Sequence, residues 1–179
     1  ARCAEFRTAE GQQRGAEICK KHGIDGLVVI GGDGSFAGAQ KLANLGINTI
    51  GVPGTIDLDI GCTEYTIGFD TAVNIAVEAI DRIADTSEAH SCFSVVEVMG
   101  RRAGFIALWS GIAGSARAIF ADSNTTAEQI VDHLRKYHFT SGTIVKFFPS
   151  SQADIWASTV GATLSDIQFK EAMRFASIV

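Results

Sequence analysis

At positions 27–35 the chain reads LVVIGGDGS. The run at 27–30 is short, rich in β-branched residues and bounded by glycines, so it predicts a buried strand of a parallel sheet. The turn that follows has almost no side chains, so backbone amides there could approach a phosphate closely. Ser35 could cap a helix predicted over residues 36–44, and the N-terminus of such a helix favours an anion. The alternative is a tight strand-to-helix turn with Asp33 as a local cap.

Asp33 places a carboxylate among these backbone donors. A carboxylate beside phosphates suggests a bridging Mg²⁺, because this ion binds through one or two carboxylates plus substrate phosphates.

Composition indicates an α/β protein without a nucleic-acid or membrane partner. The 179 residues are 46% apolar, include 19 glycines and suffice for one domain. A net charge of -5 without a basic tract argues against nucleic acid. No run reaches transmembrane length and no signal peptide opens the chain. The cysteines lack metal-site spacing and predict free thiols in a reducing cytoplasm: Cys3, Cys19, Cys62 and Cys92.

Strands and helices alternate along the chain. Strands are predicted at 48–52, 93–98, 118–120 and 142–148. Helices are predicted at 8–22, 68–86 and 103–113, and a further helix begins at a capping box formed by Thr125 and Glu128 and ends at residue 137. This order predicts parallel βαβ units, in which ligands bind beyond the carboxyl ends of the strands. The helix at 103–113 is almost wholly apolar, so we expect it to be buried.

The predicted domain organisation is an α/β core over residues 1–148 followed by a divergent segment over 149–179 with a final helix at 165–178. Because the chain opens without a methionine, we expect it to be a partial chain.

The sequence TIDLD at 55–59 follows the second predicted strand. Asp57 and Asp59 are two residues apart, so in an extended chain they point the same way. One could take a proton from a hydroxyl while the other tunes its pKa or helps to hold metal-bound water. Thr55 could hydrogen-bond a transferring phosphoryl group. The alternative, which spacing alone favours, is a solvated acidic loop.

Arg101 follows a predicted strand and a glycine at the same edge of the sheet. A guanidinium there can grip a phosphate and stabilise charge in a transition state. The alternative is a salt bridge to Glu97 or Asp85. By position alone, Arg2 reads as a surface cation. Together these groups are the parts that phosphoryl transfer requires.

The chain resembles the ATP-dependent 6-phosphofructokinase family of the bacterial type. The resemblance rests on GGDGS at 31–35, PGTIDLD at 53–59, YTIGFDTA at 65–72 and VVEVMGR at 95–101, and it thins out after residue 120. It implies a Rossmann-like fold with a parallel sheet flanked by helices. It also implies transfer of the ATP γ-phosphoryl group to the 1-hydroxyl of fructose 6-phosphate, which gives fructose 1,6-bisphosphate in glycolysis.

The resemblance also implies roles for single residues. Asp57 resembles the base that deprotonates the sugar, and Asp33 the Mg²⁺ carboxylate. Gly32, Asp33, Gly34 and Ser35 resemble the family's loop for the ATP phosphates. Arg2 resembles an arginine that reaches the same phosphates. The residues that resemble the family's contacts to the sugar phosphate are Thr55, Ile56, Asp57, Met99, Gly100 and Arg101. An aspartate is usual at position 34 in pyrophosphate-dependent relatives, so Gly34 favours ATP as the donor.

Several positions depart from the pattern of this family. Leu58 replaces an asparagine, and Cys92 replaces an arginine that reaches the sugar phosphate of a neighbouring subunit. Ala84 and Arg117 stand where an arginine and an acid serve the allosteric effector, so we do not expect that regulation in this chain. The family's late glutamate and its second half of the sugar site are not recognisable after residue 140.

Two functions remain open at this stage. The first is a kinase that works as a homo-oligomer, a tetramer in the family. The second is a non-catalytic remnant that binds nucleotide or sugar phosphate, or a regulatory subunit that pairs with a complete partner.

Overall fold

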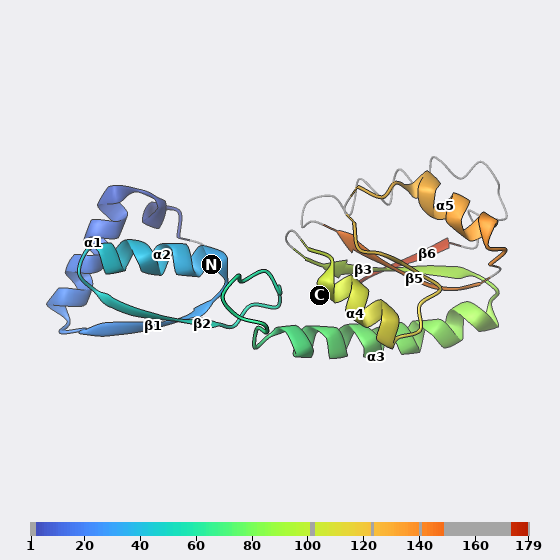
Figure 1. Ribbon diagram of the computed structural model, residues 1–179, viewed down its shortest axis with the longest axis horizontal. Helices are drawn as coiled ribbons and strands as arrows, with labels where there is room; N and C mark the ends of the chain where they lie inside the picture. The colour runs from blue at the N-terminus through green and yellow to red at the C-terminus, as the bar shows by residue number, and fades with distance from the viewer. Residues whose placement is uncertain (1–2, 101–102, 123, 140, 149–172, 179) are drawn as a thin grey trace. The chain divides into compact units, whose positions relative to one another are not determined.

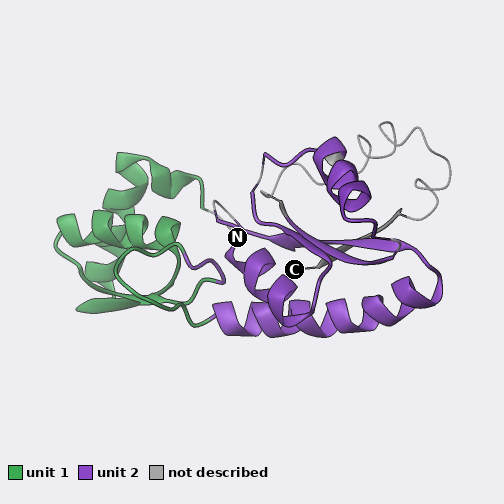
Figure 2. Cartoon of the chain, turned by 45° about the vertical axis from the view of Figure 1, so that its right-hand side comes forward, with its two compact units in different colours: residues 1–55, 59–67 green, residues 56–58, 68–179 purple. Residues whose placement is uncertain are grey.

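The computed structural model describes residues 3–100, 103–122, 124–139, 141–148 and 173–178 (Figure 1). The chain divides into two compact units (Figure 2). Unit 1 comprises Ala1–Thr55 and Asp59–Ile67, and unit 2 comprises Ile56–Leu58 and Gly68–Val179. Among the described residues, none of the helices combines the length and apolar character needed to cross a bilayer. The predicted boundary at residue 148 stays a prediction.

Unit 1 is a βαβ unit preceded by a helix. A short 3-10 helix η1 (Glu5–Arg7) leads into α1 (Ala9–Lys21), β1 (Gly26–Gly31), α2 (Asp33–Asn44) and β2 (Asn48–Pro53). The Thr8 side chain caps α1 by accepting a hydrogen bond from the Gly11 amide, and Gly23 follows the helix with φ +63°. The strands β1 and β2 pair in parallel, as predicted, with Gly31 opposite Pro53.

One face of the β1–β2 sheet is exposed, and here the prediction of a buried strand is wrong. Both helices cover the other face, where Ala16, Cys19, Leu42 and Ile47 form a small core (Figure 1). On the uncovered face, Val28, Ile30 and Ile50 are 66%, 69% and 66% exposed. The run is apolar at every position, which is typical of a strand covered on both sides, but the described residues cover only one.

Unit 2 is a four-stranded parallel sheet with helices on both faces. Its elements are α3 (Phe69–Ala89), β3 (Phe93–Met99), α4 (Phe105–Ala113), β4 (Ala118–Phe120), α5 (Ala127–Lys136), β5 (Gly142–Phe148) and β6 (Met173–Ile178). The strand order is β4-β5-β3-β6. Alternate residues of β5 enter different cores, because Ile144 packs on the side of α5 and Val145 on the side of α3 and α4. These elements confirm the predicted parallel βαβ arrangement.

The helix α4 is amphipathic in its contacts, although its sequence is almost wholly apolar. Ile106 and Ala107 are buried, whereas Leu108, Trp109 and Ile112 are 39%, 48% and 66% exposed. The prediction of a fully buried helix is therefore wrong. A helix resting on one face of a sheet buries only one side, whatever the residues on the other side are.

Two predicted helix caps are wrong by a small shift. Ser35 does not cap α2, because the helix begins at Asp33 with Gly32 as its N-cap. The capping box of α5 is formed by Thr126 and Gln129, one residue later than the predicted Thr125 and Glu128. Both pairs satisfy the sequence signature, so the signature alone could not choose between them.

The predicted final helix at 165–178 is also wrong over its described part. Residues 173–178 form β6, which pairs in parallel with β3 from Met173 opposite Phe93 to Ile178 opposite Val98. Pairing with an open strand edge supplies hydrogen bonds that a local helical pattern cannot anticipate.

Candidate active site

The glycine turn and Thr55 lie together at the carboxyl ends of β1 and β2. The Gly54 amide donates to the Gly31 carbonyl at 3.0 Å, so the chain after β2 stays beside the chain after β1. A methyl group added at Gly32 would lie 3.2 Å from the Thr55 Cβ. Any larger side chain at 32 would therefore press on Thr55. The sequence placed both segments at this edge, and unit 1 brings them into contact.

The N-terminus of α2 follows directly from this turn. The amides of Ser35 and Phe36 both donate to the Gly32 carbonyl, at 2.9 and 3.0 Å. Asp33 and Gly34 therefore occupy the first turn, where the amides of a helix carry the positive end of its dipole. A Cβ at Gly34 would meet none of the described residues within 4 Å, so the described part of the chain leaves the space beside this first turn open. The geometry is suited to a phosphate.

Asp33 is exposed at the first position of α2. Among the described residues there is no group of three His, Cys, Asp or Glu side chains that could hold a metal ion. A single exposed carboxylate beside a phosphate-binding turn still fits Mg²⁺, which takes its other ligands from phosphates and water. The donor set is therefore compatible with an ion that arrives with the nucleotide.

Asp57 is held by its two apolar neighbours. Ile56 and Leu58 pack against the core of unit 2 that contains Phe69 and Val98. This contact explains why an apolar residue is tolerated at position 58 in place of an asparagine. Because both flanking side chains are anchored, the backbone at Asp57 is fixed and its half-buried carboxyl group is presented from a defined position.

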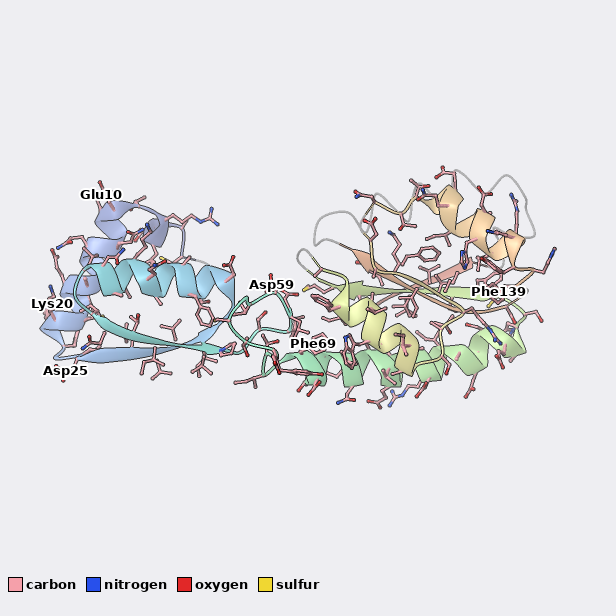
Figure 3. All side chains as sticks on the ribbon, in the orientation of Figure 1. Glu10, Lys20, Asp25, Asp59, Phe69 and Phe139 are labelled. Atoms are coloured by element: carbon pink, nitrogen blue, oxygen red, sulfur yellow. The ribbon has the colours of Figure 1, made fainter. Side chains whose placement is uncertain are left out.

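The two carboxylates of the acidic loop do not share one environment. The backbone bends over residues 56–58 instead of running extended, and Asp57 belongs to unit 2 whereas Asp59 belongs to unit 1. Figure 3 labels Asp59 in the connection between β2 and α3. The extended conformation that this expectation assumed is absent at residues 56–58, and a common direction of the two side chains stays a prediction.

Met99 ends β3 and Gly100 follows it, in the same unit as Asp57. Met99 is half exposed and Gly100 is buried. They follow Val98, which belongs to the core cluster against which Ile56 and Leu58 pack. Asp57, through its neighbours Ile56 and Leu58, and Met99, through Val98, are therefore adjacent in sequence to residues of the same hydrophobic cluster. The predicted site residues Arg2 and Arg101 lie outside the described residues.

Cys92 lies in the interior of unit 2. It is 4% exposed, its amide donates to the Ser87 carbonyl at 2.9 Å, and its carbonyl accepts from the Gly142 amide at 3.1 Å. A buried thiol in this position packs inside its own subunit.

Two features were not predicted from the sequence, one at the site and one elsewhere in unit 2. The first is the anchoring of Asp57, although the alternation Ile56-Asp57-Leu58 of apolar and acidic residues was a visible signal. The second is Lys146 in β5, a fully buried lysine whose ammonium group donates to the Asp122 carbonyl at 3.4 Å. No pattern around Lys146 distinguished it from a lysine on a strand edge.

The chain is similar to known phosphofructokinases. The family model for phosphofructokinase matches residues 1–163, which extends past the point where the sequence resemblance thinned out. The ATP-dependent 6-phosphofructokinase of Bacillus pumilus is 57% identical over 139 residues, covering 77% of this chain and 44% of that protein. The enzyme of that name from Clostridium botulinum is 61% identical over 119 residues, covering 66% of this chain and 37% of its own length. The chain spans less than half the length of these relatives.

Solved structures agree with the predicted fold class. The phosphofructokinase from Saccharomyces cerevisiae matches with a TM-score of 0.76 and 31% identity over 99% of this chain and 28% of that chain. A pyrophosphate-dependent phosphofructokinase from Nitrosospira multiformis shares the fold at a TM-score of 0.67 and 23% identity, over 94% of this chain and 48% of that chain. The prediction of parallel sheets flanked by helices is confirmed.

Proposed function

Because this chain belongs to the phosphofructokinase family, we propose that it supplies catalytic residues for phosphoryl transfer from ATP to the 1-hydroxyl of fructose 6-phosphate. The products are ADP and fructose 1,6-bisphosphate, a step of glycolysis. The observation that carries the proposal is the contact of the glycine turn with Thr55 at the carboxyl ends of β1 and β2. The free state of all four cysteines fits a cytoplasmic location.

Unit 1 holds the donor side of the reaction in this proposal. Gly32, Asp33, Gly34 and Ser35 offer backbone amides and the dipole of α2 to the ATP phosphates, and Arg2 adds a guanidinium. The open space at Gly34 leaves room for the α-phosphate of ATP, which supports ATP over pyrophosphate as the donor. Asp33 would hold Mg²⁺ together with these phosphates, and the ion would neutralise part of their charge when bound.

Asp57, Arg101 and the residues beside them serve the acceptor side. Asp57 takes the proton from the sugar 1-hydroxyl as that oxygen attacks the γ-phosphorus, and ADP leaves from the opposite side. Arg101 stabilises the charge that develops on the transferring group, and Ile56, Met99 and Gly100 contact the sugar phosphate. Thr55 donates a hydrogen bond to the transferring phosphoryl group. No residue needs to be phosphorylated, because the transfer is direct.

We expect Asp57→Asn to lower turnover at least about a hundredfold, because an amide cannot accept the proton. The measurement is ADP release with ATP, Mg²⁺ and fructose 6-phosphate, using the longest available form of the protein. Asp25→Asn is the matched control, since Asp25 is an exposed carboxylate in the loop between α1 and β1 (labelled in Figure 3).

Unchanged turnover in Asp57→Asn would contradict the role of Asp57 as the base. If the parent protein binds ATP in calorimetry but shows no turnover that depends on the sugar phosphate, the kinase proposal fails and a non-catalytic or regulatory subunit replaces it.

A further inference from the structure

Leu58 lies between the two carboxylates of the acidic loop, yet its side chain contributes to the core of unit 2. It is half-buried and packs against the hydrophobic cluster that contains Phe69 and Val98, both of which are fully buried. Removal of apolar surface from water is favourable, so this contact holds the loop against the cluster.

The segment between β2 and α3, residues 54–68, has no helix or strand of its own. A backbone hydrogen bond from the Ile67 amide to the Pro53 carbonyl, 2.8 Å long, closes its two ends. Within this segment, Ile56 and Leu58 are the apolar side chains that pack against a core cluster of the described residues. Their packing therefore fixes the middle of the segment, where the proposed base lies.

Position 58 is apolar in this chain, whereas an asparagine is usual there in the family. Asparagine has nearly the shape of leucine, but its amide group needs hydrogen-bond partners when it is buried. Leucine needs no such partner and gains free energy from contact with an apolar cluster. In this chain the loop is therefore attached at position 58 by packing.

This attachment bears on catalysis because Asp57 is the neighbouring residue. A general base works only within hydrogen-bond reach of the proton, about 2.6–3.2 Å. A misplacement of about 1 Å can lower the rate about a hundredfold. We propose that Leu58 is a positioning residue, whose packing against the cluster holds the Asp57 carboxylate where it takes the proton of the sugar 1-hydroxyl. This inference rests on the proposed function of Asp57 as the base.

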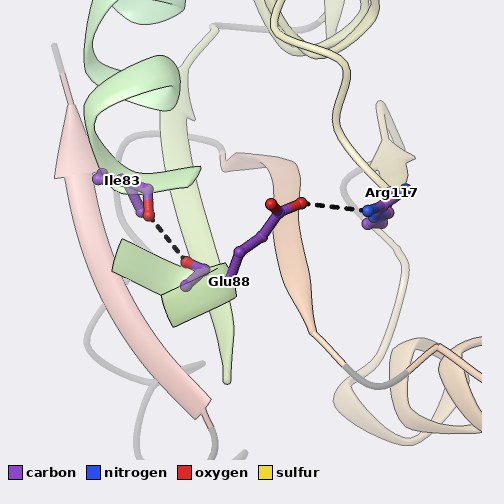
Figure 4. Close-up of polar contacts among 4 residues, drawn as sticks. Ile83, Glu88 and Arg117 are labelled. Carbon is purple, nitrogen blue, oxygen red and sulfur yellow. Dashed lines mark hydrogen bonds and ion pairs between the residues drawn. The ribbon is translucent and has the colours of Figure 1, made fainter. Parts of the chain in front are cut away.

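Ile83 provides a matched control. It is half-buried and packs against the same cluster, but it lies in the second half of α3, far from the acidic loop in the sequence. Its carbonyl accepts a hydrogen bond from the Ser87 hydroxyl group at 3.0 Å, so its backbone is held within the helix (Figure 4). Ile83→Ala therefore removes an apolar contact from the cluster without loosening the loop.

The first test separates kcat from KM in reactions of the longest available form of the protein with ATP, Mg²⁺ and fructose 6-phosphate. Leu58→Ala should lower kcat roughly ten- to a hundredfold, because the loop loses its contact with the cluster. Leu58→Asn should also lower kcat, since it keeps the shape and loses the apolar contact. Leu58→Met, which keeps the volume and the apolar character, should restore kcat to within about threefold of the parent. Ile83→Ala should leave kcat unchanged, and the KM for ATP should stay the same in every variant because the glycine turn is intact.

A double-mutant cycle tests whether Leu58 acts through Asp57. In an Asp57→Asn background the base is already lost, so the addition of Leu58→Ala should lower kcat no further. A general loss of folded protein would instead add to the effect of Asp57→Asn, and thermal melting of each variant monitors this loss. The proposal is overturned by additive effects of the two substitutions, by an equal loss of kcat in Ile83→Ala, or by full kcat in Leu58→Ala.

Hydrogen–deuterium exchange tests the attachment itself, without reference to turnover. The amides of residues 54–60 should exchange roughly fivefold faster or more in Leu58→Ala than in the parent, because local opening no longer breaks an apolar contact. Ile83→Ala should leave their exchange unchanged. Equal exchange in Leu58→Ala and the parent would overturn the positioning role. If the parent shows no turnover that depends on fructose 6-phosphate, the proposed function fails, and the exchange measurement still decides whether Leu58 fixes the loop.

Discussion

Lys146 carries a charge into the interior of unit 2. The residue is 1% exposed in the middle of β5, and its ammonium group reaches the Asp122 carbonyl. Burial lowers the pKa of Lys146 from the usual 10.5, and the Asp122 carboxylate partly offsets this by favouring the charged form. A group with a lowered pKa in the folded state binds its proton less tightly there than in the unfolded chain.

The stability of unit 2 should therefore rise with pH in the alkaline range. Between the lowered pKa of folded Lys146 and 10.5, the unfolded chain binds more protons than the folded one, so the free energy of unfolding increases with pH. Lys146→Met should abolish this rise, whereas Lys20→Met, at an exposed position of α1, should not. Denaturant unfolding followed by tryptophan fluorescence in a Trp156→Phe background reports on unit 2 through Trp109 of α4. An equal rise in the Lys146→Met variant would contradict the assignment.

For single residues, the sequence predicted which ones form the candidate site, but not the packing contacts that fix their positions. Gly32 and Thr55 could be placed at one sheet edge because parallel strands share that edge. The anchoring of Asp57 by Ile56 and Leu58 could not be predicted, because it depends on a core cluster assembled from α3, β3, α4 and β5. Local pattern carries no information about such distant partners.

Helix α5 shows how an element can have two candidate starting points. Thr125 and Thr126 are adjacent, and Glu128 and Gln129 follow each by three residues. The structure uses Thr126, whose side chain accepts from the Gln129 amide at 3.3 Å while the Gln129 side chain accepts from the Thr126 amide at 2.8 Å. The helix buries Ile130, Val131 and Leu134 against the sheet, and that packing sets its register.

Thr126→Ala should lower the free energy of unfolding by about 1 kcal/mol, because an orphan amide of the first turn loses its acceptor. Thr125→Ala should change it by roughly 0.3 kcal/mol or less, as expected for a residue without a capping role. Denaturant titration of the two variants distinguishes them. A larger loss in Thr125→Ala would mean that the helix begins one residue earlier in solution.

In the other elements, too, local sequence predicted the type of element but not its packing. Their existence and type were predictable for β1 to β5 and for α1 to α5, because apolar periodicity and glycine boundaries are local. The exposed side of α4 and the strand β6 were not, because both depend on which surfaces the rest of the chain offers for packing.

Within the part of the chain that the structure describes, each unit exposes an apolar surface. In unit 1 this surface is the outer face of the β1–β2 sheet, with Val28, Ile30 and Ile50. In unit 2 it is the outer side of α4, with Leu108, Trp109 and Ile112. Contiguous exposed apolar side chains are typical of interaction surfaces. These surfaces support the proposal that the protein is a homo-oligomer.

Light scattering should give a mass above the 18.9 kDa of one chain at working concentration. Ile112→Asn should shift the population towards the monomer by placing an amide on the outer side of α4. Tyr137→Asn, at an exposed position directly after α5, should leave the mass unchanged. A monomer in the parent protein, or equal effects of both variants, would contradict association through α4.

The short segment Ile56–Leu58 interrupts unit 1 and belongs to unit 2. The polypeptide therefore passes from one unit to the other three times within about a dozen residues, and no single scissile bond divides it into two intact halves. Expressing residues 68–179 alone would remove the Ile56 and Leu58 side chains from the core of unit 2. Expressing residues 1–67 alone would leave these two side chains exposed to water. Dissection of this protein by limited proteolysis or by truncation would damage the piece that carries Asp57, so intact and circularly permuted chains are the appropriate material for separating the contributions of the two units.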